Sequence, residues 1–477
     1  MRGLRADARL AWVLLLGSPR SERSRLALTG LGAMLGTGFA LAATVVAVIG
    51  TRFGGGAHWY TNALLNESGL RPGVIAALLL LVVPVLAFIG QCTRIGALQR
   101  ERRLAALRLA GATPRQVRRI SALETGAVCG LGSLAGLAGF LALRAVVAAA
   151  QSQPAHDYPG YAVTLTWPTD VPVPWAAAVP VVLALPVLAA LEARFALRRA
   201  AVDPLGIRLR GRRPRGRSGR VRLALWSLGP LALVGGTALV LAGLSQANAY
   251  GGGVAPYWLA AAALYAFGLL YGSAGLALMT GRLAARSGRP ALLIAGERLQ
   301  ADPWAAARAH AAVMLTALVG VGFMAMRRLQ INWIREHPTQ YASDASFYLG
   351  GYDLAGIALL IGLAVTISGL AVGTVESVLT RRRTLAALSA TGTPSRVLGR
   401  AVLLETALPL VPAIVLASGC SLAMVFGALR IVGDRGQLPL LEPLLTAAGL
   451  LAAALLATAA SLPLLRRTVH PAELRYE

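Results

Sequence analysis

The ionisable residues best placed for chemistry are two glutamates, Glu124 and Glu405, which lie near the starts of two long apolar stretches. An ionisable group at membrane depth is a functional candidate by default, because a charge in hydrocarbon is costly. Arg119 and Arg400 lie within a few helical turns of these carboxylates. We therefore expect these glutamates to form ion pairs that hold the corner of the chain, and we do not expect them to relay protons. Glu376, at the end of another apolar stretch, has the same interpretation.

Other residue types that perform chemistry are sparse. All 46 basic residues are arginines, so the chain lacks both a P-loop lysine and a Schiff-base lysine. Cys92, Cys129 and Cys420 are far apart, which predicts neither a disulfide framework nor a cysteine metal site. The five histidines are scattered, with none at the spacing of metal ligands. We predict no catalytic, metal-binding or cofactor-binding residue, and hence no enzymatic activity in this chain.

The composition is that of a membrane protein. Hydrophobic residues make up 56% and charged residues 14% of the chain, whereas soluble domains carry about a quarter charged residues. A helix needs about 20 apolar residues to cross a bilayer. Ten stretches qualify, and the seventh is the shortest: 26–50, 73–93, 122–149, 175–195, 223–243, 257–280, 309–326, 354–378, 402–429 and 440–464.

The distribution of arginine predicts the orientation. With the N-terminus inside, 38 arginines fall in the inner segments and 8 in the outer ones. Inner segments of bacterial membrane proteins retain such an excess of positive charge. An even number of helices then returns the C-terminus to the cytoplasm. This topology accounts for most of the net charge of +26, so nucleic acid is not an expected partner.

An internal repeat divides the chain. Arg102–Thr125 and Arg383–Thr406 align without gaps at an offset of 281, with 11 of 24 positions identical. A second match, Val202-x-Pro204 with Val469-x-Pro471, closes each copy. The predicted fold is therefore an all-α integral membrane protein with a 4+2+4 arrangement of helices. The predicted domains are 1–208, the basic linker with helices 5 and 6 at 209–290, and 291–477.

The repeated segments predict a short helix, a sharp corner and a membrane helix. Gly111 and Gly392 are predicted to end the short helices, because glycine tolerates the left-handed conformation there. Thr113-Pro114 and Thr393-Pro394 are then expected to start the next helices, with threonine as the N-cap. Leucines share one face of each short helix at i, i+3 spacing and arginines flank them; these residues are Leu104, Leu107, Leu385, Leu388, Arg102, Arg103, Arg382 and Arg383.

The sequence LAALRLAGATPRQV, with Glu124 downstream, resembles the signature of FtsX-like permeases, the membrane subunits of MacB/LolCDE-type ABC transporters. The terminal PAELRYE is similar to the end of that domain. The resemblance covers 73–208 and 354–477. It implies two FtsX-like units in one chain. It also implies that the short helices at 101–110 and 382–391 are coupling helices that dock on a separate ABC ATPase, in two copies, which binds ATP and Mg²⁺.

The resemblance implies a subunit of the bacterial plasma membrane that exports or extracts an amphiphilic compound such as an antibiotic, peptide or lipid, with membrane lipids as further partners. The alternative is a non-transporting subunit that transmits force to an extracytoplasmic or sensor partner. Many relatives carry a large outer domain, whereas this chain has only the short loops 51–72 and 327–353, which counts against the alternative. A lipid-modifying membrane enzyme is disfavoured, because no acid–base cluster lies near a membrane face.

Charge reversal at Arg102, Arg103, Arg382 and Arg383 is predicted to uncouple the partner ATPase from the permease while insertion is retained. Proline at Leu107 and Leu388 should act in the same way, because it breaks the short helices. The measurement is stimulation of the partner's ATP hydrolysis in nanodiscs. Unchanged stimulation in these variants would refute the assignment of coupling helices.

Overall fold

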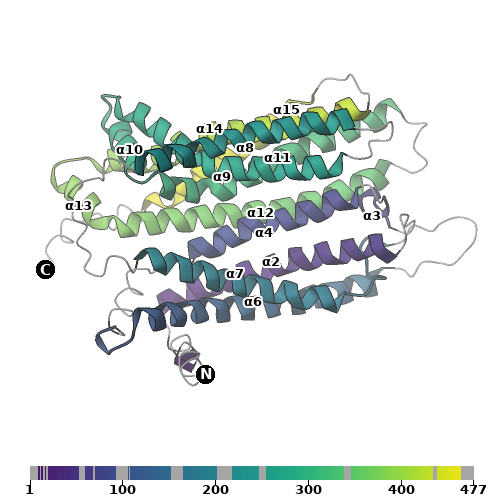
Figure 1. Ribbon diagram of the computed structural model, residues 1–477, viewed down its shortest axis with the longest axis horizontal. Helices are drawn as coiled ribbons and strands as arrows, with labels where there is room; N and C mark the ends of the chain where they lie inside the picture. Colours follow the sequence, from purple (N-terminus) through teal and green to yellow (C-terminus); the bar gives the residue numbers. More distant parts are fainter. Residues whose placement is uncertain are drawn as a thin grey trace, which may run out of the picture. The chain divides into compact units, whose positions relative to one another are not determined.

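The computed structural model is almost entirely helical in the part of the chain that it describes. The described residues are 9–10, 12–13, 17, 20–52, 60–67, 70–92, 106, 108–151, 165–200, 218–246, 254–337, 345–432 and 438–463. The helices (Figure 1) are α2 (Arg20–Arg52), α3 (Ala63–Asn66), α4 (Arg71–Cys92), α6 (Pro114–Ala150), α7 (Trp175–Ala200), α8 (Ser218–Gln246), α9 (Ala255–Ala285), α10 (Pro290–Ala301), α11 (Pro303–Glu336), α12 (Ala345–Thr380), α13 (Arg382–Ala390), α14 (Ser395–Val432) and α15 (Leu441–Ala460).

Nine helices in the described residues are long and apolar enough to cross a membrane. They coincide with nine of the ten predicted stretches. The remaining stretch, 175–195, lies in α7. The apolar segment found there, Trp175–Leu191, falls short of the 18 residues required of a candidate span. The prediction of a helical, multi-pass membrane protein is confirmed at this level, whereas the 4+2+4 arrangement and the position of the termini stay predictions.

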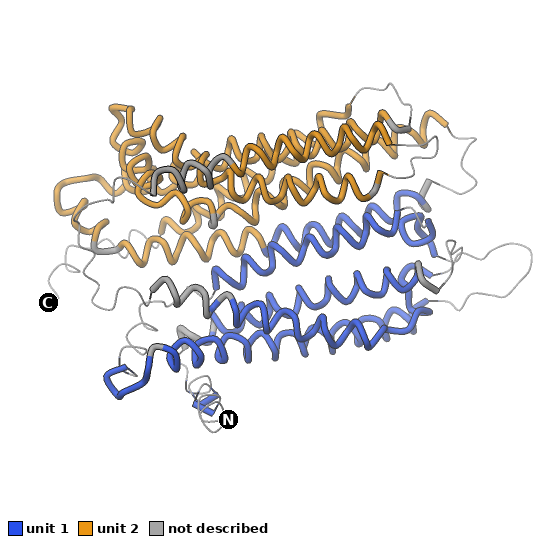
Figure 2. The backbone as a smooth tube through the Cα atoms, in the orientation of Figure 1, with its two compact units in different colours: residues 1–210, 339–365 blue, residues 211–338, 366–477 orange. Residues whose placement is uncertain are grey.

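The helices gather into two compact units (Figure 2), which comprise residues 1–210 with 339–365, and residues 211–338 with 366–477. The division falls inside α12, so this helix contributes to both units. The predicted domains were defined by the internal repeat in the sequence, whereas the compact units are defined by which helices pack together. The boundaries of the predicted domains therefore stay predictions.

In the first unit, α2 packs against α4, α6 and α7. A buried cluster around Val85, Phe88 and Ile89 of α4 includes Ala33 of α2 and Cys129 of α6. Glycines bring α2 and α6 into backbone contact. A Cβ at Gly136 would lie 2.6 Å from the carbonyl oxygen of Met34, and a Cβ at Gly132 would overlap the carbonyl of Gly30. Small residues in helix interfaces permit this close approach.

The described parts of the segments that follow α2 and α6 fold onto the first unit. Tyr60 forms a parallel bridge with Leu165, and its hydroxyl donates to the Asp170 carboxylate at 2.9 Å. Burial and this carboxylate raise the pKa of Tyr60. Arg71 donates to the carbonyls of Leu65 and Asn66, both at 2.7 Å. Residues 60–67 and 165–171 are thus held in place by hydrogen bonds.

In the second unit, α9 packs against α8, α10, α11 and α14, and α14 packs against α11 and α15. Glycine again sets the closest approach. A Cβ at Gly229 of α8 would lie 2.6 Å from the Cα of Gly272 in α9. The hydroxyls of Thr237 and Tyr265 hydrogen-bond across the same pair of helices at 3.0 Å. The α8–α9 hairpin is therefore tightly packed along its length.

Substitution of alanine for Gly132 is predicted to destabilise the protein by about 1–3 kcal/mol, because its methyl group has no space against the backbone of α2. Gly139→Ala, in the same helix, is the matched control, since its Cβ would meet only the flexible Met34 side chain at 3.5 Å. Thermal unfolding in detergent, followed by size-exclusion chromatography, measures the difference. Equal melting of the two variants would contradict the packing described here.

Candidate functional site

Each unit contains one candidate site, which consists of its repeated corner and the carboxylate that follows it. Gly111 and Gly392 both have a φ of 92°, the left-handed conformation predicted for them. The N–H of Gly111 donates to the carbonyl of Arg108 at 2.9 Å, and that of Gly392 donates to Ser389 at 3.0 Å. The donor and acceptor positions of the two bonds differ by the same 281 residues. Both bonds are of the kind that closes a helix in a Schellman motif. The two copies therefore share the conformation of the corner.

The helix after each corner also starts at an equivalent position. In the first copy, Thr113 caps α6 and Pro114 is its first residue, as predicted. The Thr113 N–H donates to Oε1 of Gln116, and the Gln116 N–H donates back to Oγ1 of Thr113, which completes a capping box. In the second copy, α14 starts one residue later than predicted, at Ser395. The carbonyl of Pro394 accepts from the Val397 N–H there, at 2.9 Å.

The two copies expose the same positions of the short helix. Ala106, Leu109 and Ala110 are exposed in the first copy, and Leu109 has 91% of its surface open. The residues 281 positions later, Ala387, Ala390 and Thr391, are exposed in the second. Leu109 is thus a large apolar side chain with almost no covering atoms, a feature that often marks an interaction site when it belongs to a patch.

The leucines of α13 face the opposite way. Leu385 is 8% exposed and belongs to a buried cluster with Val378 of α12 and Leu398 of α14, against which Leu388 and Ile294 of α10 also pack. These leucines therefore hold α13 to its own unit and leave the other face free. The helix α13 also carries Arg382 and Arg383, but the structure does not describe their side chains. The other predicted coupling residues lie outside the described residues; these are Arg102, Arg103, Leu104 and Leu107.

In the first unit, the carboxylate of Glu124 is buried and paired with Arg25 of α2. Nη2 of Arg25 donates to Oε1 of Glu124 at 3.1 Å, and both side chains are only 4% exposed. Nε of Arg25 is buried without a hydrogen-bond partner. A buried pair is weak evidence of stability by itself, but removal of one partner leaves an uncompensated charge. This pair ties the start of α6 to the start of α2.

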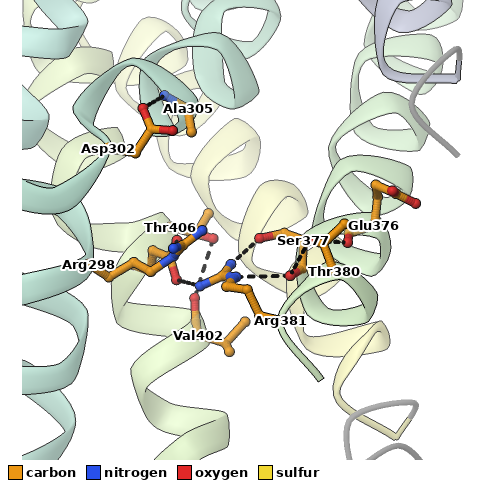
Figure 3. A network of polar contacts seen from close by, with 10 residues as sticks. Arg298, Asp302, Ala305, Glu376, Ser377, Thr380, Arg381, Val402 and Thr406 are labelled. Atoms are coloured by element: carbon orange, nitrogen blue, oxygen red, sulfur yellow. Dashed lines mark hydrogen bonds and ion pairs between the residues drawn. The ribbon is translucent and has the colours of Figure 1, made fainter. Parts of the chain in front are cut away.

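In the second unit, the carboxylate of Glu405 has two arginine partners, Arg298 and Arg381, which Figure 3 labels. Nε of Arg298 on α10 donates to Oε1 of Glu405 at 3.2 Å, and Nη1 of Arg381 donates to Oε2 at 2.9 Å. Arg381 also donates from Nε to the carbonyl of Ser377 at 2.9 Å and from Nη2 to the Ser377 hydroxyl. We call Ser377, Arg381, Glu405 and Arg298 the arginine latch.

The arginine latch joins four elements at one point. Arg381 is the N-cap residue of α13, Ser377 belongs to the last turns of α12, Glu405 to α14 and Arg298 to α10. The side chains of Arg381, Glu405 and Arg298 remain partly open to solvent, between 17% and 36% exposed. Burial and the positive charge of Arg381 lower the pKa of Arg298, and Glu405 opposes this shift. A displacement of the start of α13 would act directly on Glu405.

The predicted partners of the two glutamates were nearby arginines. Arg400, predicted for Glu405, is exposed, and Glu405 pairs with Arg381 and Arg298. Glu124 pairs with Arg25, which precedes it by 99 residues. Among the described residues, no three His, Cys, Asp or Glu side chains are placed to hold a metal ion.

Residues 73–202 match the family described as FtsX-like permease C-terminal. The matched part contains α4, the first corner, α6 and α7. No curated protein matches the chain. The first repeated segment is thus similar to that family, and the helices around it are those of an integral membrane protein.

Substitution of Glu124 by glutamine is predicted to lower the free energy of unfolding by about 3–5 kcal/mol, because it strands the buried Arg25. Glu405→Gln is predicted to lower it by about 1 kcal/mol or less, because that pair is partly solvated. Unfolding in mixed detergent and dodecyl sulfate micelles, followed by tryptophan fluorescence, provides the comparison.

The double variant Glu124→Gln/Arg25→Met is the control for this prediction. It removes the stranded charge, so it should recover much of the stability lost in Glu124→Gln. A double variant no more stable than the single one, or equal losses in the two single variants, would contradict the difference in burial.

Proposed function

We propose that the chain is the permease subunit of an ABC transporter and couples ATP hydrolysis by a separate ATPase to the export or extraction of an amphiphilic compound. The observation that carries this proposal is the pair of corners, which share their glycine conformation, the start of the next helix and their exposed positions at an offset of 281. The family match over the first corner supports the same assignment.

In this proposal the exposed faces of the short helices dock on the ATPase. The first face consists of Ala106, Leu109 and Ala110, and the second of Ala387, Ala390 and Thr391. Small exposed residues allow close approach of a partner surface, and Leu109 supplies an apolar anchor. The inward leucines Leu385 and Leu388 pack α13 against α10, α12 and α14, so that a push on α13 reaches these helices.

The arginine latch then passes the motion of α13 to the membrane helices. Arg381 moves with the start of α13 and draws Glu405, and with it α14. Because Glu405 also binds Arg298, α10 follows. In the first unit, the buried Arg25–Glu124 pair joins α2 to α6. ATP and Mg²⁺ belong to the partner in this scheme, with one ATPase copy for each corner.

The finer assignments belong to the same proposal. The domains are two FtsX-like units at 1–208 and 291–477, with the linker and two helices at 209–290 between them. The protein lies in the bacterial plasma membrane with both termini in the cytoplasm, and its partners include lipids and the amphiphilic substrate.

The alternative role, force transmission without transport, has one observation in its favour. The outer segments of the first unit are hydrogen-bonded through Tyr60, Asp170 and Arg71, and could present a stable surface to an outer partner. Transport of amphiphiles into or out of proteoliposomes separates the two roles. A coupled complex that hydrolyses ATP but moves no amphiphile, and instead activates an outer partner, would establish the alternative.

The substitution Leu109→Asp, and with it Ala390→Asp, is predicted to reduce binding of the ATPase by at least tenfold, because each introduces a charge into a desolvated contact. The control is Arg335→Glu, which makes the same change of two charge units at the exposed end of α11. Co-purification with the ATPase encoded beside this chain, followed by ATP hydrolysis in nanodiscs, tests the proposal. A stable wild-type protein that binds no ATPase would refute it.

A further inference from the structure

The turn between α9 and α10 presents three arginines to solvent. Arg282 and Arg286 lie one helical turn apart at the end of α9, and Arg289 caps the start of α10; all three are exposed. None of them takes part in an ion pair found among the described residues. Three unneutralised charges therefore share one short turn.

The sequence before the turn contains no carboxylate. Residues 205–296 contain 11 arginines and not one aspartate or glutamate, and the first acidic residue after the turn is Glu297, which is exposed on α10. Elsewhere in the chain arginine is mixed with acidic residues, as at Arg25 and Glu124. A segment with charge of one sign calls for a partner of the opposite sign.

Large apolar side chains are exposed beside the arginines. Met279 and Leu283 are 61% and 65% exposed, and they lie on the same face of α9 as Arg282 and Arg286. Leu293 of α10 is 44% exposed. In a lipid leaflet, the acyl chains lie deeper in the membrane than the phosphates. Apolar side chains beside arginines can contact these two parts of one lipid. Guanidinium groups also bind phosphate through paired hydrogen bonds.

The turn is a rigid platform for these side chains. A Cβ at Gly296 of α10 would lie 2.5 Å from the backbone nitrogen of Ala285 and 2.6 Å from the carbonyl oxygen of Gly281. The two helices are therefore in backbone contact. At 12 residues, α10 is too short to cross a bilayer, so its arginines remain at the membrane boundary beside the end of α9.

We propose that the turn between α9 and α10 binds the headgroup of an anionic phospholipid. Arg282, Arg286 and Arg289 hold the phosphate, and Met279, Leu283 and Leu293 contact the acyl chains. The same α10 carries Arg298 of the arginine latch and Ile294 of the cluster under α13. A bound lipid therefore also stabilises the position of α13, a consequence that rests on the proposed function, whereas lipid binding itself does not.

The test compares phosphatidylglycerol with phosphatidylcholine binding to the purified full chain, measured by native mass spectrometry from detergent. The wild type is expected to retain phosphatidylglycerol selectively. R282Q/R286Q is expected to bind it roughly 30-fold more weakly, since each arginine near an anionic surface contributes about fivefold in affinity. Binding of phosphatidylcholine should not change.

The matched control is R396Q/R400Q, which removes two exposed arginines at the same i, i+4 spacing near the start of α14. No large apolar residue is exposed between 384 and 410, so this pair should not hold a lipid. If R282Q/R286Q proves unstable, R289Q alone is expected to lose about fivefold in affinity. The substitution lies in the turn and leaves both helices intact.

Three outcomes would overturn the proposal. Equal affinity for the two lipids would remove the role of the anionic headgroup. An equal loss in R396Q/R400Q would reduce the effect to net charge. If millimolar inorganic phosphate displaces bound phosphatidylglycerol as effectively as added phosphatidylglycerol does, the arginines bind a soluble anion and not a lipid headgroup. None of these measurements requires the ATPase, so a failure here is distinct from a failure of the proposed function.

Discussion

A carboxylate withdrawn from water must be neutralised, and the arrangement around the two corners follows from this requirement. Glu124 and Glu405 occupy equivalent positions of the repeat, yet each is neutralised differently. Glu124 is sealed in the core with Arg25, both 4% exposed. Glu405 remains partly hydrated and is shared by Arg381 and Arg298. The Arg25–Glu124 pair therefore holds its two helices together, whereas Glu405 can exchange an arginine contact for water at a small cost in free energy.

The difference suggests different mechanical roles for the two corners. A buried pair breaks only at a large energetic cost, so α2 and α6 should move as one body, and their glycine contacts reinforce this. The arginine latch instead joins the N-cap residue of the short helix α13 to α14 and α10. Because α10 is in backbone contact with α9, and α9 with α8, a displacement at α13 has a continuous path into these helices.

The sequence predicted those features that depend on neighbouring residues. Apolar length located nine spanning helices, because a bilayer imposes a fixed thickness on the chain. Gly111 and Gly392 were predicted in the left-handed conformation, because a side chain is strained there. Thr113 and Pro114 were predicted at the start of α6 from capping chemistry. The offset of 281 relates the two corners in the sequence alone.

Only the tertiary structure decided which groups meet. The partners of Glu124 and Glu405 include Arg25 and Arg298, at separations of 99 and 107 residues, and no local pattern encodes such a contact. The leucines of α13 formed an apolar stripe in the sequence, but only packing decided that it faces Ile294 and Leu398 and leaves Ala387 and Ala390 open. Local propensity and bilayer thickness act along the chain, so the sequence determined the helices and corners. Neutralisation of charge and close packing act through space, so the fold alone selected the arginine for each carboxylate.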